Sequence, residues 1–164
     1  MCGGASRRET SGRTANEMNP GNAVRLDFRS SFAMLDLVQT VSDHIGRKAG
    51  LDDEALHWVG VALRESVINA IKHGNGNDEE KRVHVEFTPL VDETPPGIAI
   101  RVRDEGGGFD PATIPDCCAP ENILKGSGRG IFLIRSFMDE LTLQRAPEGG
   151  MEVVMVKRAQ PQRV

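Results

Sequence analysis

The chain has few cysteines: Cys2, Cys117 and Cys118 are the three among its 164 residues. Three cysteines do not provide a framework of paired bridges, and adjacent residues such as the last two rarely bridge each other. A small domain held together by disulfides is therefore excluded. A chain of this length is about one domain and can bury a core without such bridges. We expect it to work in a reducing cytoplasm.

Long apolar runs are also missing. No stretch approaches the roughly 20 apolar residues that a membrane helix needs. Residues 1–11 contain no hydrophobic segment that could act as a secretion signal. We therefore expect a soluble, intracellular protein that does not interact with membranes.

Basic residues interleaved with aromatic ones do not occur either. The net charge is −4, and because both ends of the chain are basic, the body between them is more acidic than this total. An acidic body without a basic stripe argues against direct contact with nucleic acid. Proteins and nucleotides remain as ligands.

The chain divides into a leader, a body and a tail. Residues 1–22 are rich in Gly, Ser, Thr, Asn and Arg without apolar periodicity, and we predict that they are disordered. Residues 23–158 carry the regular patterns of one folded domain, and residues 159–164 are predicted to form a flexible tail. Residues 109–125 have no periodicity and contain three prolines, so we expect a long loop there that acts as a lid, with Cys117 and Cys118 filling it.

The apolar spacing of the body predicts both strands and helices. Period-two alternation predicts strands near residues 24–28, 83–87, 98–102, 141–145 and 152–156. Capping residues and steps of three and four predict helix starts at Ser30 or Ser31, at Asp52 or Asp53, and after Gly130. Gly50 is predicted to end the first helix, and Gly74 to end the second in a left-handed conformation.

The second predicted helix carries a polar face. Glu65 and Asn69 are one turn apart, and Lys72 and His73 extend the same line. Mg²⁺ takes oxygen ligands and keeps several waters, so the amide oxygen of Asn69 and the phosphates of ATP can complete its shell. A carboxylate such as Glu65 can accept a hydroxyl proton in phosphoryl transfer. Spacing alone leaves another interpretation open, a solvated face on which Glu65 pairs with Arg64 or Lys72.

Two glycine-rich motifs follow. The first, Asp104-Glu105-Gly106-Gly107-Gly108-Phe109, comes directly after a predicted strand. A carboxylate at a strand end can accept a hydrogen bond from the exocyclic amine of adenine, whereas guanine presents a carbonyl there. The alternative for this motif is an acidic loop with glycine turns.

The second glycine motif, Gly126-Ser127-Gly128-Arg129-Gly130, lies where a loop becomes a helix. Unpaired amides at a helix start attract phosphate, and glycines leave room for it. Neither a Walker loop nor a dinucleotide fold fits, because no Gly-Lys-Ser/Thr ending is present and the glycines do not follow the first strand. Arg129 can contact phosphate or face solvent.

The order of these motifs and elements resembles the ATP-binding domain shared by histidine kinases, gyrase, Hsp90 and MutL, the GHKL superfamily. The resemblance covers about residues 24–157, and the wording GSGRGIFLIRSFMDEL looks most like the bacterial anti-sigma factor serine/threonine-protein kinases. It implies an α+β fold: a two-layer sandwich of the Bergerat type, with a mixed, mostly antiparallel sheet covered on one face by helices. It also implies ATP and Mg²⁺ as cofactors.

The resemblance assigns roles to residues and suggests partners. It implies that Glu65 is the catalytic base, Asn69 the metal ligand and Asp104 the reader of adenine. The other cofactor-binding residues that it implies are Lys72, His73, Gly106, Gly108, Phe109, Gly126, Ser127, Gly128, Arg129, Gly130 and Ile131. The implied partners are a sigma factor and a small STAS-type anti-anti-sigma antagonist that is phosphorylated on serine, and a homodimer is compatible with the family.

The sequence departs from the family pattern at one position, and two other functions are compatible with it. Many relatives have a threonine after the paired glycines near the end, whereas Met151 follows Gly149 and Gly150 here, so the adenine contact is expected to be weaker or rearranged. One alternative is a regulator that binds ATP without turning it over. The other is the separate catalytic domain of a histidine kinase, for which His44, His57 and His84 offer no phosphoacceptor context.

Overall fold

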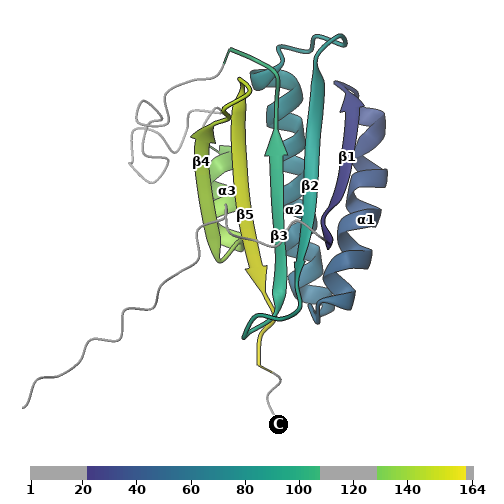
Figure 1. Ribbon diagram of the computed structural model, residues 1–164, viewed down its shortest axis with the longest axis vertical. Coiled ribbons are helices and arrows are strands. Elements are labelled where there is room, and N and C mark those ends of the chain that lie inside the picture. The colour runs from purple at the N-terminus through teal and green to yellow at the C-terminus, as the bar shows by residue number, and fades with distance from the viewer. Residues whose placement is uncertain (1–21, 108–128, 162–164) are drawn as a thin grey trace, which may run out of the picture.

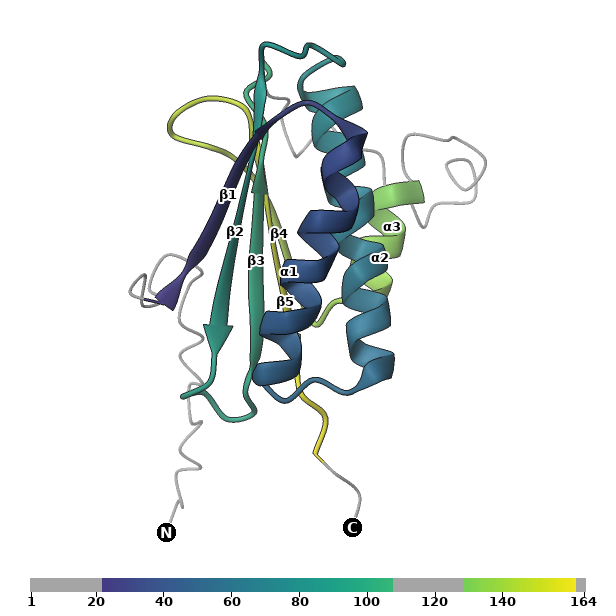
Figure 2. The ribbon, with the colours of Figure 1, turned by 90° about the vertical axis from the view of Figure 1, so that its right-hand side faces the viewer.

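The computed structural model describes residues 22–107 and 129–161, which form a sheet and a layer of helices (Figures 1 and 2). The strands are β1 (Val24–Arg29), β2 (Arg82–Leu90), β3 (Gly97–Arg103), β4 (Glu140–Arg145) and β5 (Met151–Arg158). Their order in the sheet is β1-β2-β3-β5-β4, and every described pairing is antiparallel.

The helices are α1 (Leu35–Lys48), α2 (Asp53–Asn69) and α3 (Arg129–Phe137), with a 3₁₀ turn before α1 (Phe32–Met34) and a π turn after α2 (Ala70–Gly74). All of them lie on one face of the sheet (Figure 2). The predicted two-layer α+β sandwich is therefore confirmed, but the described strands form a wholly antiparallel sheet and not the mixed one that was expected. Within the described ranges, no helix has the length and hydrophobicity that a membrane crossing requires.

Side-chain caps mark the start of the 3₁₀ turn that leads into α1 and the start of α2, and a glycine follows the end of α1. The Ser31 hydroxyl accepts a hydrogen bond from the Ala33 amide at 3.3 Å, and Asp52 Oδ1 accepts one from the Ala55 amide at 2.8 Å. These side chains satisfy amides that a helix start leaves without partners. Gly50 follows α1 with a φ of 93°, as predicted for the residue that ends this helix.

The predicted left-handed stop at Gly74 is wrong. Asn75 donates its amide to the Ala70 carbonyl at 2.8 Å, five residues back, and this wider turn carries the helix through Gly74. The left-handed residues come later, at Gly76 with a φ of 61° and Asn77 with a φ of 58°. Packing against a distant segment, described below, gives Gly74 a different reason to lack a side chain.

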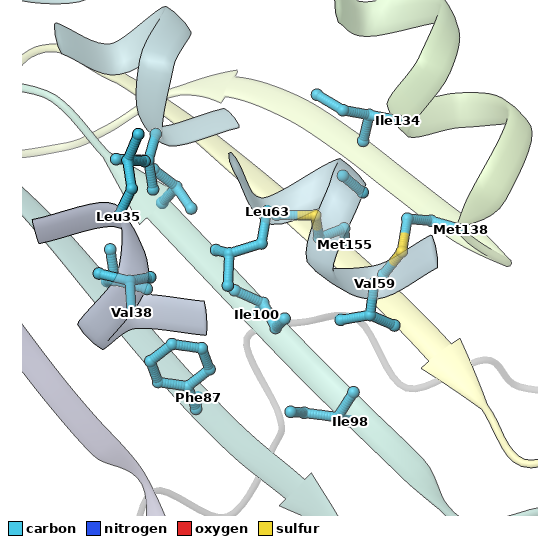
Figure 3. Packing of buried hydrophobic residues seen from close by; sticks show 14 of the residues in the cluster. Leu35, Val38, Val59, Leu63, Phe87, Ile98, Ile100, Ile134, Met138 and Met155 are labelled. Atoms are coloured by element: carbon cyan, nitrogen blue, oxygen red, sulfur yellow. The ribbon is translucent and has the colours of Figure 1, made fainter. Parts of the chain in front are cut away.

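The core lies between the sheet and α2. Alternate residues of β2 and β3 point toward the helices, and apolar side chains of all three helices meet them (Figure 3). Fully buried members include Val38, Val59, Leu63, Val83, Val85, Phe87, Ile98, Ile100, Ile134 and Met155. Because the apolar stripe of α2 is used in this way, its remaining face is left for polar residues.

The chain direction brings the motifs to one end of the molecule. Both α2 and β3 run toward the same end, where the loop between β4 and β5 also lies (Figures 1 and 2). Gly130, at the start of α3, packs against Asn69 and Glu65 of α2. Segments that are far apart in the sequence are thus neighbours around the ends of α2 and β3.

Candidate functional site

The polar face of α2 meets the first turn of α3. Glu65 and Asn69 are both half-buried there. A Cβ on Gly130 would lie 2.7 Å from Asn69 Nδ2 and 3.1 Å from Glu65 Oε2. The two side chains predicted for metal binding and proton transfer therefore lie together beside the last glycine of the second glycine motif.

The neighbouring arginine does not pair with Glu65. Arg64 instead bonds to Asp36 Oδ1 at 3.0 Å and Gln39 Oε1 at 3.1 Å, on the side facing α1. Among the described residues, Glu65 takes part in no ion pair with a lysine or arginine. The interpretation of this face as a set of solvated ion pairs is not supported, and the Glu65 carboxylate is available for another partner.

Lys72 and His73 lie further along and are exposed. Lys72 Nζ is 5.8 Å from the centre of the Phe32 ring, within the range of a cation–π contact. The structure thus places Lys72 beside Phe32, and the roles of Lys72 and His73 in cofactor binding stay predictions.

Asp104 is held rigidly at the end of β3. It is 5% exposed, and its Oδ1 accepts hydrogen bonds from the amides of Gly106 at 2.9 Å and Met151 at 3.1 Å. Its own amide donates to the Met151 carbonyl at 3.1 Å. Within the described part of the chain, no group donates a hydrogen bond to Oδ2. One oxygen of the carboxylate is therefore anchored, and the other remains able to accept a bond from a ligand.

Backbone from two other segments packs directly against this aspartate. A Cβ on Gly74 would overlap the Asp104 carboxylate, and one on Gly106 would overlap the Gly74 carbonyl oxygen. Gly150, with a φ of 84°, is equally close to the Asp104 carbonyl. The ends of α2, β3 and the β4–β5 loop can approach this closely only because these positions lack side chains.

The next residue adds fixed negative charge. Glu105 Oε1 accepts the Arg82 amide at 2.7 Å, and Oε2 is 3.0 Å from His84 Nε2. These contacts, the Arg82 amide first and His84 second, hold the pKa of the Glu105 carboxyl below its ordinary value. The other ring nitrogen of His84 is 2.5 Å from Asp27 Oδ1 on β1.

The remaining predicted residues are only partly described. Gly108, Phe109, Gly126, Ser127 and Gly128 lie outside the described residues, as do Cys117, Cys118 and the predicted lid. Arg129 and Gly130 form the beginning of α3, and Ile131 is half-buried in its first turn.

The donor set fits a metal that is shared with a ligand. In residues 22–107 and 129–161, no group of three or more His, Cys, Asp or Glu side chains is arranged to hold a metal ion. Asn69 offers a neutral amide oxygen, and Mg²⁺ commonly accepts one or two protein oxygens while water and phosphate complete its octahedron. The residues present therefore suit Mg²⁺ bound together with a nucleotide.

Two contributors to this site were not predicted from the sequence. The Met151 amide holds Asp104, at the position where a threonine would be expected in relatives. Asn75 holds the backbone of Glu105, its Oδ1 accepting the Glu105 amide at 2.8 Å. The glycine pair before Met151 was a usable signal for the first contact, but no periodicity or motif marks the second.

The folded part of the chain matches a known family. The family described as the histidine kinase-like ATPase domain matches residues 28–157, in agreement with the predicted GHKL-type fold. Among solved structures, the histidine kinase domain from the Erythrobacter litoralis EL346 blue-light activated histidine kinase aligns with a TM-score of 0.45 and 22% identity. That alignment covers 77% of this chain and 59% of the other.

Curated relatives match over most of their length. The serine-protein kinase RsbW of Staphylococcus aureus is 30% identical over 148 residues, which cover 86% of this chain and 89% of the relative. The serine-protein kinase RsbW of Listeria monocytogenes serovar 1/2a is 29% identical over 119 residues, with 69% and 72% covered.

Proposed function

The chain belongs to the histidine kinase-like ATPase family, in which it groups with the RsbW serine-protein kinases, and from this we propose that it is an ATP-dependent serine protein kinase and an anti-sigma factor. Its protein substrate would be a small STAS-type antagonist, and its second partner a sigma factor that it sequesters in the cytoplasm. The family assignment itself implies that the domain binds ATP.

One observation carries the proposal. Glu65 and Asn69 meet at Gly130, where the second glycine motif leads into α3, while Asp104 lies against Gly74 at the end of the π turn that extends α2. The residues proposed to bind phosphate and the residue proposed to read the base are therefore both in contact with α2 and the π turn that extends it. This arrangement supports binding of an adenine nucleotide together with a metal ion.

Each end has its own recognition chemistry. Oδ2 of Asp104 can accept a hydrogen bond from the exocyclic amine of adenine, and it would face the carbonyl of guanine with repulsion. At the other end, the amides at the start of α3 favour phosphate. Asn69 would hold Mg²⁺, which when bound neutralises charge on the phosphates during transfer.

Glu65 would act on the protein substrate. Its carboxylate accepts the proton of the incoming serine hydroxyl as the serine oxygen forms its bond to the γ-phosphorus. The bond from that phosphorus to the bridging oxygen breaks, and ADP leaves with the electron pair. Because phosphoryl transfer depends mainly on alignment and charge neutralisation, a single positioned carboxylate is sufficient on the protein side.

Phosphorylation would also end the complex with the antagonist. A phosphoserine adds about two negative charges, and it would arise beside the Glu65 carboxylate on a chain whose net charge is already −4. Repulsion and desolvation would then weaken the interface. The antagonist would leave, and the chain would be free to bind the sigma factor.

The experiment is transfer of label from γ-labelled ATP to purified STAS-type antagonists of the same organism. The wild type should label one of them on serine, and Glu65→Gln should bind ATP normally but transfer at least about 100-fold more slowly, the usual contribution of a general base. Unchanged transfer by Glu65→Gln would remove the proposed mechanism. Tight ATP binding without transfer to any antagonist would leave a regulator that only binds ATP.

A further inference from the structure

A buried asparagine links the two ends of the site. Asn75 is 2% exposed and lies directly after the π turn that extends α2. We propose that Asn75 is a positioning residue that fixes the adenine-reading Asp104 relative to the helix carrying Asn69, and so sets the preference for adenine. This inference rests on the proposed function.

The amide of Asn75 contacts several separate segments. Its Nδ2 donates to Ser30 Oγ at 2.9 Å, after β1, and to the Arg82 carbonyl at 3.0 Å, at the start of β2. Its Oδ1 accepts the Glu105 amide at 2.8 Å, after β3. Both donor hydrogens and the acceptor oxygen are thus used, which no aliphatic, hydroxyl or carboxylate side chain could reproduce.

Asn75 is itself fixed to the metal-binding helix. Its backbone amide donates to the Ala70 carbonyl at 2.8 Å, and Ala70 directly follows Asn69. Glu105 directly follows Asp104. The hydrogen bond between Asn75 and Glu105 therefore connects the turn that follows Asn69 to the residue that follows Asp104.

The hydrogen bond between Asn75 and Glu105 controls the position of Asp104 because the surrounding groups are closely packed. The Gly74 carbonyl faces Gly106, and the Asp104 carboxylate faces Gly74, in both cases with no room for a Cβ. Gly74 directly precedes Asn75, and Asp104 and Gly106 lie on either side of Glu105. A shift of the segment at 104–106 away from 74–75 would open this packing and move Oδ2 from the position that reads the base.

Ser30 provides a matched control. Its hydroxyl accepts from Asn75 and donates to the Lys81 carbonyl at 2.8 Å, so it belongs to the same buried network. No described contact joins Ser30 to residues 104–106. Ser30→Ala should cost stability as Asn75→Ala does, but without releasing Glu105.

The test measures binding of Mg²⁺-ATP, Mg²⁺-GTP and Mg²⁺-tripolyphosphate to the full chain by calorimetry. For Asn75→Ala we expect the Kd for ATP to rise roughly tenfold or more, because the part-buried Glu105 amide loses its acceptor and the segment shifts, and the ratio of ATP to GTP affinity to fall. Binding of tripolyphosphate, which has no base, should stay within about twofold. Ser30→Ala should keep the wild-type ATP affinity and ATP/GTP ratio.

The outcomes separate the two proposals. A wild type that binds none of the nucleotides overturns the proposed function, and with it this inference. A wild type that binds ATP selectively while Asn75→Ala does the same overturns this inference alone. Equal losses for ATP and tripolyphosphate, or equal effects of Ser30→Ala, would mean that Asn75 only stabilises the fold. If Asn75→Ala does not fold, Asn75→Ser, whose hydroxyl is too short to reach Glu105, is held to the same expectations.

Discussion

The Asp104 carboxylate rests on the Cα of Gly74, so the end of β3 and the end of α2 are in direct contact. Thirty residues separate these positions in the chain, and neither could hold a larger or differently placed side chain without moving the other. The position of the proposed adenine reader is therefore set by the helix that also carries Glu65 and Asn69.

A methyl group at Gly74 tests this contact. In Gly74→Ala the Cβ would overlap the Asp104 carboxylate, which cannot simply turn away because Gly106 and Met151 hold its other oxygen. We expect the Kd for Mg²⁺-ATP to rise roughly tenfold or more. Gly76→Ala is the control: its φ of 61° strains an alanine, but the Cβ meets nothing within 4 Å. Calorimetry should show normal ATP affinity for that variant, and equal affinities for both variants would contradict the contact's role.

A methyl group at Gly130 tests the other end of the site. In Gly130→Ala the Cβ would come within 2.7 Å of Asn69 and 3.1 Å of Glu65, both flexible side chains that can move aside. We expect the helix to remain stable, since alanine favours helix by about 1 kcal/mol over glycine, while phosphoryl transfer falls at least about tenfold.

The matched control for that variant is Gly60→Ala. This position lies within α2, where the three nearest neighbours of a Cβ would be atoms of the flexible Gln39 side chain, the first at 3.0 Å. Transfer by Gly60→Ala should equal that of the wild type. A Gly130→Ala variant that transfers phosphate at the wild-type rate would show that the start of α3 does not shape the proposed phosphate-binding end of the site.

Features of the fold that depend on residues close together in the sequence could be predicted from the sequence. The alternation of Val83, Val85 and Phe87 predicted β2, and the capping groups of Ser31 and Asp52 predicted two helix starts, because each signal acts within a few residues. The predicted order of motifs was likewise sufficient to name the fold.

The features that were predicted wrongly or missed depend on contacts between residues far apart in the sequence. Gly74 looked like a helix stop, but its lack of a side chain serves Asp104, 30 positions away, and the left-handed turn occurs at Gly76 instead. The bonds from Asp104 to Met151 and from Glu105 to Asn75 span 47 and 30 residues. No pattern within one segment encodes such partners, and they appear only when the sheet register is formed.

Stability should depend on Glu105 at acidic pH. Because its pKa is lowered in the folded state from an ordinary value of 4.5, the folded chain binds fewer protons than the unfolded chain just below that pH. The stabilisation is thus complete above the unfolded pKa and is lost as the pH falls through the folded pKa. Chemical denaturation should show that acidification below pH 4.5 reduces the free energy of unfolding more in the wild type than in Glu105→Gln. Parallel curves for the two proteins would contradict this account.

The far end of α3 is anchored by an aromatic stack. Trp58 of α2 and Phe137 of α3 lie nearly parallel, 4.0 Å apart with an interplanar angle of 9°. Trp58→Ala should lower the free energy of unfolding by about 2–4 kcal/mol, from lost burial and stacking. Trp58→Phe should retain most of it. Urea denaturation followed by circular dichroism measures both, and a loss below about 1 kcal/mol in the alanine variant would show that the stack does not hold α3.

The most direct test of the account is calorimetric titration of Mg²⁺-ATP into the wild type, Asn69→Ala and Asp104→Asn. If the nucleotide binds as proposed, the wild type should have one site and each variant should bind at least roughly tenfold more weakly. Asp104→Asn alone should lose the preference for ATP over GTP. Wild-type ATP affinity in both variants would place the nucleotide elsewhere and contradict the central claim.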